Sequence, residues 1–297
     1  MYLFSLANTQ KLSQQICQKT KFKHGQYKTV SFSDGEIYLQ LQNKVRGQNV
    51  YILGSTCQPN DNIIELLILI NALKENGAKK ITAIIPYFGY ARQDKIDHFG
   101  APVTAKLLAQ LFKQAGINKF ITVDIHSQRD QKYLGPNLIN IEPLLIFADY
   151  IKKNIGLKNT LVVAPDNGAK TRALKLAKLL DPLPVLVLQK IRPTQNMAKV
   201  LKFKQNIKGK NIIMADDMID TAGTITAACH ELKKHQVKDI YIFATHGILS
   251  GPALARINRA PIKQVIITDT YPLAKERKSK KIKVLSIAPL LIKRLLK

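Results

Sequence analysis

Short hydrophobic runs alternate with longer amphipathic segments along most of the chain. The runs are rich in β-branched residues and have the length of strands, whereas the longer segments have helical periodicity. This alternation is typical of parallel sheets with helices on both faces. Strands are predicted at 48–54, 79–86, 118–125, 159–165, 183–190, 210–216, 238–245 and 263–269, and helices at 61–77, 102–116, 142–154, 169–180 and 223–236.

The two halves of the chain repeat this plan, so the sequence predicts two similar α/β domains. A boundary is expected at Glu142-Pro143. In both halves the predicted strands run into loops that hold the unusual polar residues. Ligands of open parallel sheets bind beyond the carboxyl ends of the strands, and these loops are therefore expected to line one crevice.

Composition narrows the class of protein. The chain has 297 residues and 46% hydrophobic content, which suits compact domains with buried cores. Its longest apolar run, residues 63–73, is about half the length of a membrane span and contains Glu65 and Asn71. The N-terminus lacks the features of a signal peptide, and the three cysteines form no CxxC pair. We expect a cytoplasmic protein without a membrane segment.

The net charge of +26 is the most unusual global feature. Three interpretations are open: binding to nucleic acid or a membrane surface, attraction of acidic small substrates, or a lysine-rich composition in general. The lysines are scattered over nearly every predicted surface segment, and only residues 275–283 form a dense cluster. This scatter favours the compositional interpretation, and nucleic acid is not an expected partner.

The segment "DDMIDTAGTI" (216–225) predicts a binding site for a sugar phosphate. A helix is expected to begin in its small-residue turn, where free backbone N–H groups and the helix dipole favour an anion. Carboxylates at the strand end would repel phosphate but accept hydrogen bonds from a vicinal diol. A ribose 5-phosphate unit needs both features. The candidate residues are Asp216, Asp217 and Asp220 for the sugar and Thr221, Ala222, Gly223 and Thr224 for the phosphate.

Two further loops of the second half carry groups suited to phosphate chemistry. In "APDNGAKTRA" a strand ends at Asp166, and Asn167-Gly168 form a turn before a helix, which predicts an anion nest. In "LQKIRP" Lys190 and Arg192 lie two apart on a predicted strand and project to the same side. Paired cations of this kind suit charge that develops on transferring phosphoryl oxygens.

The first half supplies weaker candidates. His126 follows a predicted strand and is a possible metal ligand, although such a histidine is more often a hydrogen-bonded turn residue. Aromatic and polar residues in "FSDGE" and "ARQD" suit a purine. They are Phe32, Asp34 and Glu36 in the first motif and Arg92 and Gln93 in the second.

Taken in order, these loops resemble those of the ribose-phosphate pyrophosphokinases, which make phosphoribosyl pyrophosphate. The resemblance runs from "FSDGEI" and "KVRG" through "IPYFGYARQD", "VDIHSQ", "VVAPDNGAKTRA", "QKIRP" and "DDMIDTAGTIT" to "THGILSGPALARI" and "LSIAPLL". It covers nearly the whole chain. The "DDMIDTAGT" motif is shared with phosphoribosyltransferases, but the ordered set is more specific.

The resemblance implies a fold, a reaction and an assembly. It implies two phosphoribosyltransferase-type domains at 1–142 and 143–285, with a final helix at 286–297 that packs back on the first domain. It implies transfer of the β,γ-diphosphoryl group of Mg-ATP to the 1-hydroxyl of ribose 5-phosphate, which releases AMP. It also implies a homo-oligomer, a hexamer built from dimers.

The resemblance also assigns roles to residues. Lys190 and Arg192 match the catalytic pair, and Arg192 is further expected to contact ribose 5-phosphate. His126 and Asp166 match the magnesium positions, and residues 166–168 match the pyrophosphate loop. The ribose 5-phosphate site matches Asp216, Asp217 and residues 220–224. The ATP site matches Phe32, Asp34, Gly35, Glu36, Arg92 and Gln93. Residues 34–36 are expected to contact the adenine from a neighbouring subunit.

Three other functions are distinguishable from this one. A non-catalytic regulatory paralogue would be expected to lose catalytic residues, yet His126, Lys190, Arg192 and Asp216 are all present. A phosphoribosyltransferase would share the sugar-phosphate loop but would not need "FSDGE" and "ARQD". A nucleic-acid binder is supported by charge alone.

The chain departs from the family pattern in several places. After "RQD" it has "KIDHFGA" where the family commonly has a run rich in Lys and Arg. After His126 the usual run is replaced by "RDQKYL", and the pyrophosphate loop has Gly168, Ala169 and Lys170 in place of a glycine pair and an aliphatic residue. The resemblance implies activation by inorganic phosphate and inhibition by ADP at a site between subunits, and the basic run of the family lies close to both that site and ATP.

We therefore expect ADP to inhibit mainly by competing with ATP, and inorganic phosphate to activate only weakly. Each lost charge-assisted contact should weaken anion binding by about 1.5–3 kcal/mol, which is roughly tenfold or more in affinity. Steady-state assays that vary ADP at saturating ATP test this expectation. Strong cooperative inhibition that ATP cannot relieve would contradict it.

Overall fold

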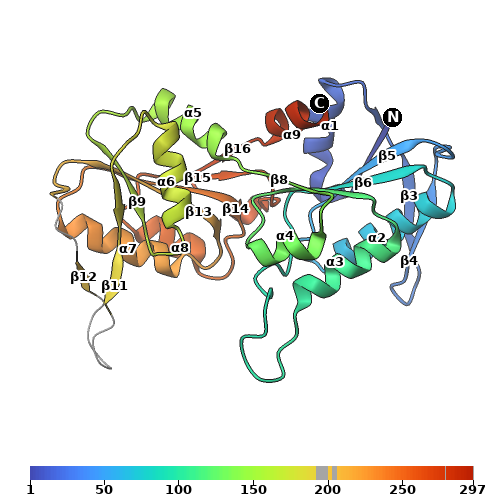
Figure 1. Ribbon diagram of the computed structural model, residues 1–297, viewed down its shortest axis with the longest axis horizontal. Coiled ribbons are helices and arrows are strands. Elements are labelled where there is room, and N and C mark those ends of the chain that lie inside the picture. Colours follow the sequence, from blue (N-terminus) through green and yellow to red (C-terminus); the bar gives the residue numbers. More distant parts are fainter. Residues whose placement is uncertain (192–199, 203–205, 278, 297) are drawn as a thin grey trace. The chain divides into compact units, whose positions relative to one another are not determined.

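The computed structural model forms two compact α/β units. It describes residues 1–191, 200–202, 206–277 and 279–296, with side chains described except at 189–191, 200–202 and 275. Unit 1 comprises Met1–Glu142, Thr270–Pro272 and Ser286–Lys297, and unit 2 comprises Pro143–Asp269 and Leu273–Leu285. Each unit holds a parallel sheet flanked by helices, which confirms the predicted fold class (Figure 1).

Unit 1 is built on a parallel sheet with an added hairpin. The sheet order is β2 (Lys23–His24), β1 (Tyr2–Ser5), β5 (Asn49–Leu53), β6 (Lys80–Ile85), β7 (Lys119–Val123) and β8 (Leu138–Ile141). The antiparallel hairpin joins β3 (Tyr27–Ser31) to β4 (Ile37–Leu41). The helices are η1 (Ala7–Thr9), α1 (Gln10–Gln18), α2 (Asp61–Glu75), α3 (Thr104–Ala115), α4 (Gln128–Leu134) and α9 (Ala288–Leu295).

Unit 2 repeats the same plan. Its parallel sheet has the order β10 (Val185–Val187), β9 (Thr160–Ala164), β13 (Asn211–Ile219), β14 (Ile240–Gly247), β15 (Gln264–Thr268) and β16 (Ile282–Leu285). Strands β11 (Gln189–Ile191) and β12 (Val200–Lys202) form its hairpin. The helices are α5 (Leu144–Asn154), α6 (Lys170–Leu179), α7 (Gly223–Lys234), α8 (Ala253–Arg259) and η2 (Lys275–Arg277).

In both sheets the strand order reverses at one point. The chain leaves β1 toward β2 on one side, whereas it leaves β5 toward β6 on the other side. The same reversal lies between β9 and β13 in unit 2. Ligands of such sheets bind beyond the carboxyl ends of the strands at this switch point. In unit 2 it carries the loop after β9, which holds the candidate pyrophosphate residues, and the loop after β13, which leads into the candidate phosphate cradle.

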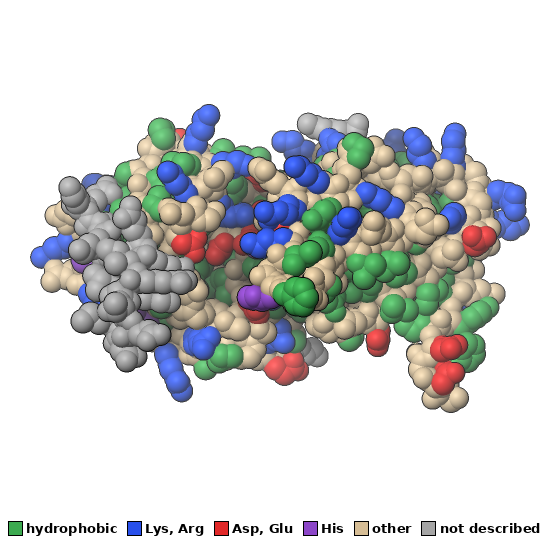
Figure 2. Space-filling view, turned by 60° about the horizontal axis from the view of Figure 1, so that its bottom comes forward, with side chains coloured by type: hydrophobic (Ala, Val, Ile, Leu, Met, Phe, Trp, Pro, Cys, Tyr) green, Lys and Arg blue, Asp and Glu red, His purple; other side chains and the backbone are tan. Residues whose placement is uncertain are grey.

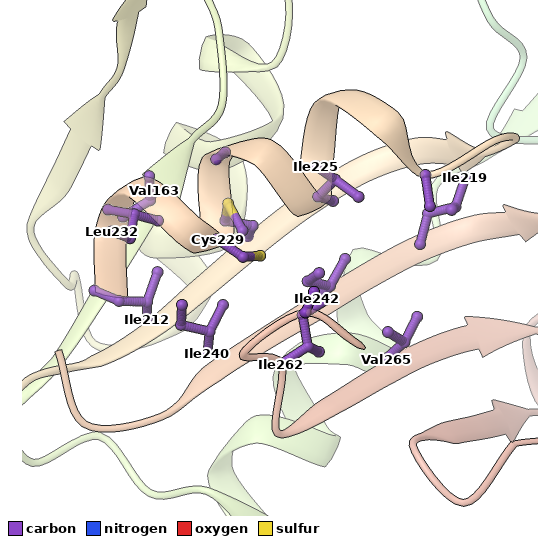
Figure 3. Close-up of a cluster of buried hydrophobic side chains, with 14 of the residues drawn as sticks. Val163, Ile212, Ile219, Ile225, Cys229, Leu232, Ile240, Ile242, Ile262 and Val265 are labelled. Atoms are coloured by element: carbon purple, nitrogen blue, oxygen red, sulfur yellow. The ribbon is translucent and has the colours of Figure 1, made fainter. Parts of the chain in front are cut away.

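The core of unit 2 fixes the helix that follows β13. Along α7, Ile225, Cys229 and Leu232 recur at helical spacing and are all buried. Figure 3 shows them facing strand residues that include Ile212 and Ile242. This apolar face holds the first turn of α7 against the sheet.

The predicted elements are present, with differences at their ends. The segment 183–190 divides between β10, which pairs with β9, and β11, which turns away to pair with β12. Strand β13 continues to Ile219 because its last residues still pair with β14. Gly116 directly follows α3, and Gly77 lies two residues after the end of α2; both have positive φ, which is typical of the ends of helices.

Lys and Arg side chains are spread over much of the face shown in Figure 2. Within the described residues, no helix has both the length and the hydropathy needed to cross a membrane.

Leu232→Ala is expected to lower the free energy of unfolding by about 2–5 kcal/mol, because it removes a fully buried side chain from the core under α7. His230 lies exposed on the same helix, so His230→Ala should cost less than about 0.5 kcal/mol. Urea denaturation of both variants measures the difference. Equal stabilities would show that α7 is not anchored by this core.

Candidate functional site

The loop between β13 and α7 presents backbone N–H groups. Strand β13 ends at Ile219, and Ala222 precedes α7 in the left-handed conformation, with φ 59°. Among the described residues, the N–H groups of residues 221–224 donate to no backbone carbonyl. These groups lie at the positive end of the helix dipole. The loop therefore has the form of an anion cradle.

Two adjacent carboxylates precede this cradle on β13. Asp217 N donates to Asp216 Oδ1 at 2.9 Å, and Asp217 is only 9% exposed. Burial raises the pKa of Asp216 to about 7, and the charge of Asp217 contributes, while Arg172 on α6 opposes the shift. Near neutral pH Asp216 is therefore partly protonated, so it can both accept and donate hydrogen bonds to hydroxyl groups.

Asp220 is held by the loop that follows β14. The Ser250 hydroxyl donates to Asp220 Oδ1, and the Ser250 N–H donates to the Asp220 carbonyl at 3.1 Å. On α8, Arg256 Nη1 donates to the Thr221 carbonyl at 2.9 Å. Sequence analysis did not identify Ser250 or Arg256. Their motif "THGILSGPALARI" was recognised only as part of the resemblance.

The loop after β9 lies beside the cradle strand. Val163 of β9 pairs with Met214 of β13, so their carboxyl ends meet at one edge of the sheet. In this loop Ala169 N donates to Asp166 Oδ1 at 3.2 Å. The structure thus brings Asp166, Asn167 and Gly168 to the same edge as residues 216–224.

The predicted catalytic pair is described only in part. The backbone of Lys190 lies in β11, paired with Leu201 of β12. Its side chain and the whole of Arg192 lie outside the described residues.

The candidate nucleotide residues of unit 1 occupy two separate segments. Phe32, Asp34, Gly35 and Glu36 form the exposed tip of the β3–β4 hairpin, where Gly35 N donates to the Phe32 carbonyl at 2.9 Å. Figure 1 shows this hairpin and the loop before α3 as separate extensions of the unit.

The loop before α3 holds Arg92 and Gln93. The Thr104 hydroxyl donates to Gln93 Oε1 at 2.6 Å, and the Gln93 carbonyl accepts from Ala105 N at 3.2 Å. Gln93 is thus tied to the start of α3, and Arg92 is exposed beside it.

His126 is exposed near two buried carboxylates. Arg129 Nη1 donates to Asp94 Oδ2 at 3.3 Å. Burial alone would raise the pKa of Asp94, but hydrogen bonds from Ser127 and Arg129, with the charges of Arg129 and His126, hold it below its usual value. Burial also raises the pKa of Asp130 to about 6. The segment "RDQKYL", which departs from the family pattern, forms most of α4 and places the carboxyl group of Asp130 near His126.

The candidate metal ligands lie in different units. His126 belongs to unit 1 and Asp166 to unit 2. In the described part of the chain, no three or more His, Cys, Asp or Glu side chains are grouped to hold a metal ion. Mg²⁺ commonly takes one or two carboxylates together with waters and substrate phosphates, so the carboxylate of Asp166 fits such an ion.

Comparison with known proteins gives a consistent result. Residues 1–116 match the model for the N-terminal domain of ribose phosphate pyrophosphokinase, and residues 178–296 match that for the phosphoribosyl synthetase-associated domain. The ribose-phosphate pyrophosphokinase of Caldanaerobacter subterraneus subsp. tengcongensis is 42% identical over 99% of this chain and 93% of its own. That of Bacillus subtilis is 40% identical over 97% and 91%.

A solved structure extends the similarity to the fold. The crystal structure of phosphoribosylpyrophosphate synthetase from Mycobacterium smegmatis has a TM-score of 0.91 and 34% identity to this chain. The match covers 99% of this chain and 97% of that one. Both units are therefore part of the similarity.

Asp216→Asn is expected to raise the melting temperature at pH 8. Between about pH 4 and pH 7 the folded protein holds a proton on Asp216 that the unfolded chain has released, so wild-type stability falls as pH rises through this window. The variant lacks that group, and its advantage should shrink toward pH 5.

Thermal denaturation from pH 5 to pH 8 measures this effect. Asp149→Asn, at an exposed position on α5, is the matched control and should leave the pH dependence unchanged. The burial argument fails if Asp216→Asn and Asp149→Asn behave alike at every pH.

Proposed function

The chain belongs to the ribose-phosphate pyrophosphokinase family, and we propose that it transfers the β,γ-diphosphoryl group of Mg-ATP to the 1-hydroxyl of ribose 5-phosphate. The products are phosphoribosyl pyrophosphate and AMP. The observation that carries the proposal is the loop after β13, where an anion cradle directly follows an acid pair. A sugar phosphate needs both groups side by side.

The sugar phosphate is bound by unit 2. The N–H groups of Thr221 to Thr224 receive the 5-phosphate, with the helix dipole adding to their attraction. Asp216, Asp217 and Asp220 accept hydrogen bonds from the ribose hydroxyls. The raised pKa of Asp216 limits the repulsion of the phosphate, because a partly protonated carboxyl group carries less negative charge.

The nucleotide is bound by residues of unit 1. Arg92 and Gln93 contact ATP of their own chain, and Phe32, Asp34, Gly35 and Glu36 serve the adenine of a neighbouring subunit. Two features support the second role: the tip is exposed, and Phe32 leaves half of its surface open to a partner. The active protein is then a homo-oligomer, a hexamer built from dimers.

The reaction is an in-line displacement at the β-phosphorus. The 1-hydroxyl oxygen forms a bond to this phosphorus and loses its proton, while the bond to the α,β-bridging oxygen breaks and AMP leaves with the electron pair. Lys190 and Arg192 stabilise the charge that develops on the phosphoryl oxygens, and Arg192 also contacts the sugar phosphate.

Magnesium belongs to this scheme as the ion of Mg-ATP. Bound Mg²⁺ neutralises charge on the phosphoryl oxygens and orients them. Asp166 and His126 are the protein groups that would hold it. Asn167 and Gly168 provide backbone groups for the pyrophosphate beside Asp166. Such an enzyme of nucleotide synthesis, with nothing among its described helices to span a membrane, works in the cytoplasm.

Incubation of the purified protein with ATP, ribose 5-phosphate and Mg²⁺ tests the function. Phosphorus NMR should show AMP and phosphoribosyl pyrophosphate forming in equal amounts. ADP in place of AMP would indicate ordinary phosphoryl transfer and contradict the proposal. No turnover would favour a regulatory paralogue, and reaction only with a nucleobase and phosphoribosyl pyrophosphate would favour a phosphoribosyltransferase.

Lys190→Ala should lower kcat by several orders of magnitude while the melting temperature stays close to wild type, because its charge acts mainly in the transition state. Lys178→Ala, at an exposed position on α6 of the same unit, is the control and should retain activity. Near-normal turnover of Lys190→Ala would remove Lys190 from the mechanism.

A further inference from the structure

The segment after β14 donates hydrogen bonds to three consecutive carbonyl groups of the cradle loop. The N–H groups of Ile248 and Leu249 both donate to the Ile219 carbonyl at 3.0 Å. Ser250 N donates to the next carbonyl, that of Asp220, and Arg256 Nη1 donates to the following one, that of Thr221. Residues 248–256 thus hold each carbonyl from 219 to 221; we call this segment the clamp.

The planar trans peptide turns this grip into an anion site. In each peptide the carbonyl of one residue and the N–H of the next point in opposite directions. Because the carbonyls of residues 219–221 are directed to the clamp, the N–H groups of Asp220, Thr221 and Ala222 are directed away from it. Consecutive N–H groups on one side of a loop can form an anion-binding nest, and those of Thr221 and Ala222 belong to the cradle described above.

Two side chains of the clamp make contacts that backbone alone would not supply. The Ser250 hydroxyl donates to Asp220 Oδ1 and so limits the rotamers of this carboxylate. The Arg256 guanidinium lies against Gly223, where an added Cβ would come within 3.2 Å of Nη1. Arg256 therefore contacts both the last peptide of the loop and the first residue of α7.

The clamp is itself rigidly placed. Leu249 is buried in the core of unit 2 in the left-handed conformation, with φ 53°. Ala253 N donates to the Ser250 carbonyl at 3.1 Å, which joins Ser250 to the start of α8. Arg277 Nη1 donates to the Ile248 carbonyl at 2.5 Å from the other side. A clamp fixed at three points can hold the loop in one shape.

We propose that Ser250 and Arg256 are positioning residues for ribose 5-phosphate, which rests on the function proposed above. Arg256 aligns the Ala222 N–H by holding the Thr221 carbonyl, and its charge raises the local preference for a phosphate dianion. Ser250 aligns the Thr221 N–H through its backbone and the Asp220 carboxylate through its hydroxyl. Neither side chain has a part in binding ATP.

Substitutions at the two residues should separate the substrates. Arg256→Ala is expected to raise the KM for ribose 5-phosphate about tenfold or more, which is the usual scale for losing a charge-assisted hydrogen bond. The KM for ATP should change less than about twofold. Ser250→Ala should give a smaller shift in the same direction, and Arg256→Lys, which keeps the charge without the guanidinium geometry, should lie between wild type and Arg256→Ala.

Arg259→Ala is the matched control. Arg259 carries the same charge and is exposed about one turn further along α8, and its guanidinium makes no hydrogen bond or ion pair with the described residues. It should leave both KM values unchanged. Melting temperatures of all variants show whether each one folds. If Arg256→Ala does not fold, Ser250→Ala still tests the proposal.

Calorimetric titration of the full chain with ribose 5-phosphate alone gives a readout that does not need turnover. Wild type should bind, and Arg256→Ala should bind at least about tenfold more weakly. If wild type binds the sugar phosphate but forms no product, the proposed function fails while the clamp is still tested by binding. Parallel changes in both KM values, unchanged binding in Arg256→Ala, or full recovery in Arg256→Lys would overturn the positioning role.

Discussion

The planarity of the peptide bond is the constraint on which the site of unit 2 depends. A loop can offer several N–H groups to one anion only if its carbonyls are satisfied on the opposite side. Here the N–H groups of Ile248, Leu249 and Ser250 and the guanidinium of Arg256 meet that need. The binding surface of the β13–α7 loop therefore originates in a segment that comes about thirty residues later in the chain.

The two units show two outcomes of the same topology. At the switch point of unit 1, Asn8 Nδ2 donates to the Ser55 carbonyl at 2.8 Å, and the Ser55 hydroxyl donates to the Thr270 carbonyl at 2.7 Å. The loops after β1 and β5 thus satisfy one another. At the equivalent point of unit 2, the loop after β13 directs N–H groups and carboxylates outward. The loops at the switch point therefore bond to one another in unit 1, whereas in unit 2 they leave polar groups for a ligand.

Sequence patterns predicted the features that depend on local chemistry. Hydrophobic periodicity located the central strands and long helices, and the small residues at 221–224 indicated an anion cradle in the loop between β13 and α7. Short edge strands such as β2 and β16 were not predicted, because two to four residues are too few to show a hydrophobic periodicity. The roles of Ser250 and Arg256 were not predicted for a different reason. Both residues donate hydrogen bonds to backbone carbonyls, which every residue has, so the sequence does not show which carbonyls they contact. The split of 183–190 into β10 and β11 likewise depends on pairing with β9 and β12.

The carboxylates next to the cradle suit the binding of a sugar but lower the stability of the protein without a ligand. Asp216 is partly buried next to the buried Asp217, and keeping both carboxylates ionised without a ligand is unfavourable, as the raised pKa of Asp216 indicates. Hydroxyl donors from a sugar would compensate part of this cost, whereas replacement by Asn would remove it together with the strongest acceptors. Arg172 on α6 supplies a positive charge that acts on Asp216 and opposes the rise of its pKa. The acid pair is thus tolerated because the raised pKa and the charge of Arg172 together reduce the repulsion between its two carboxylates.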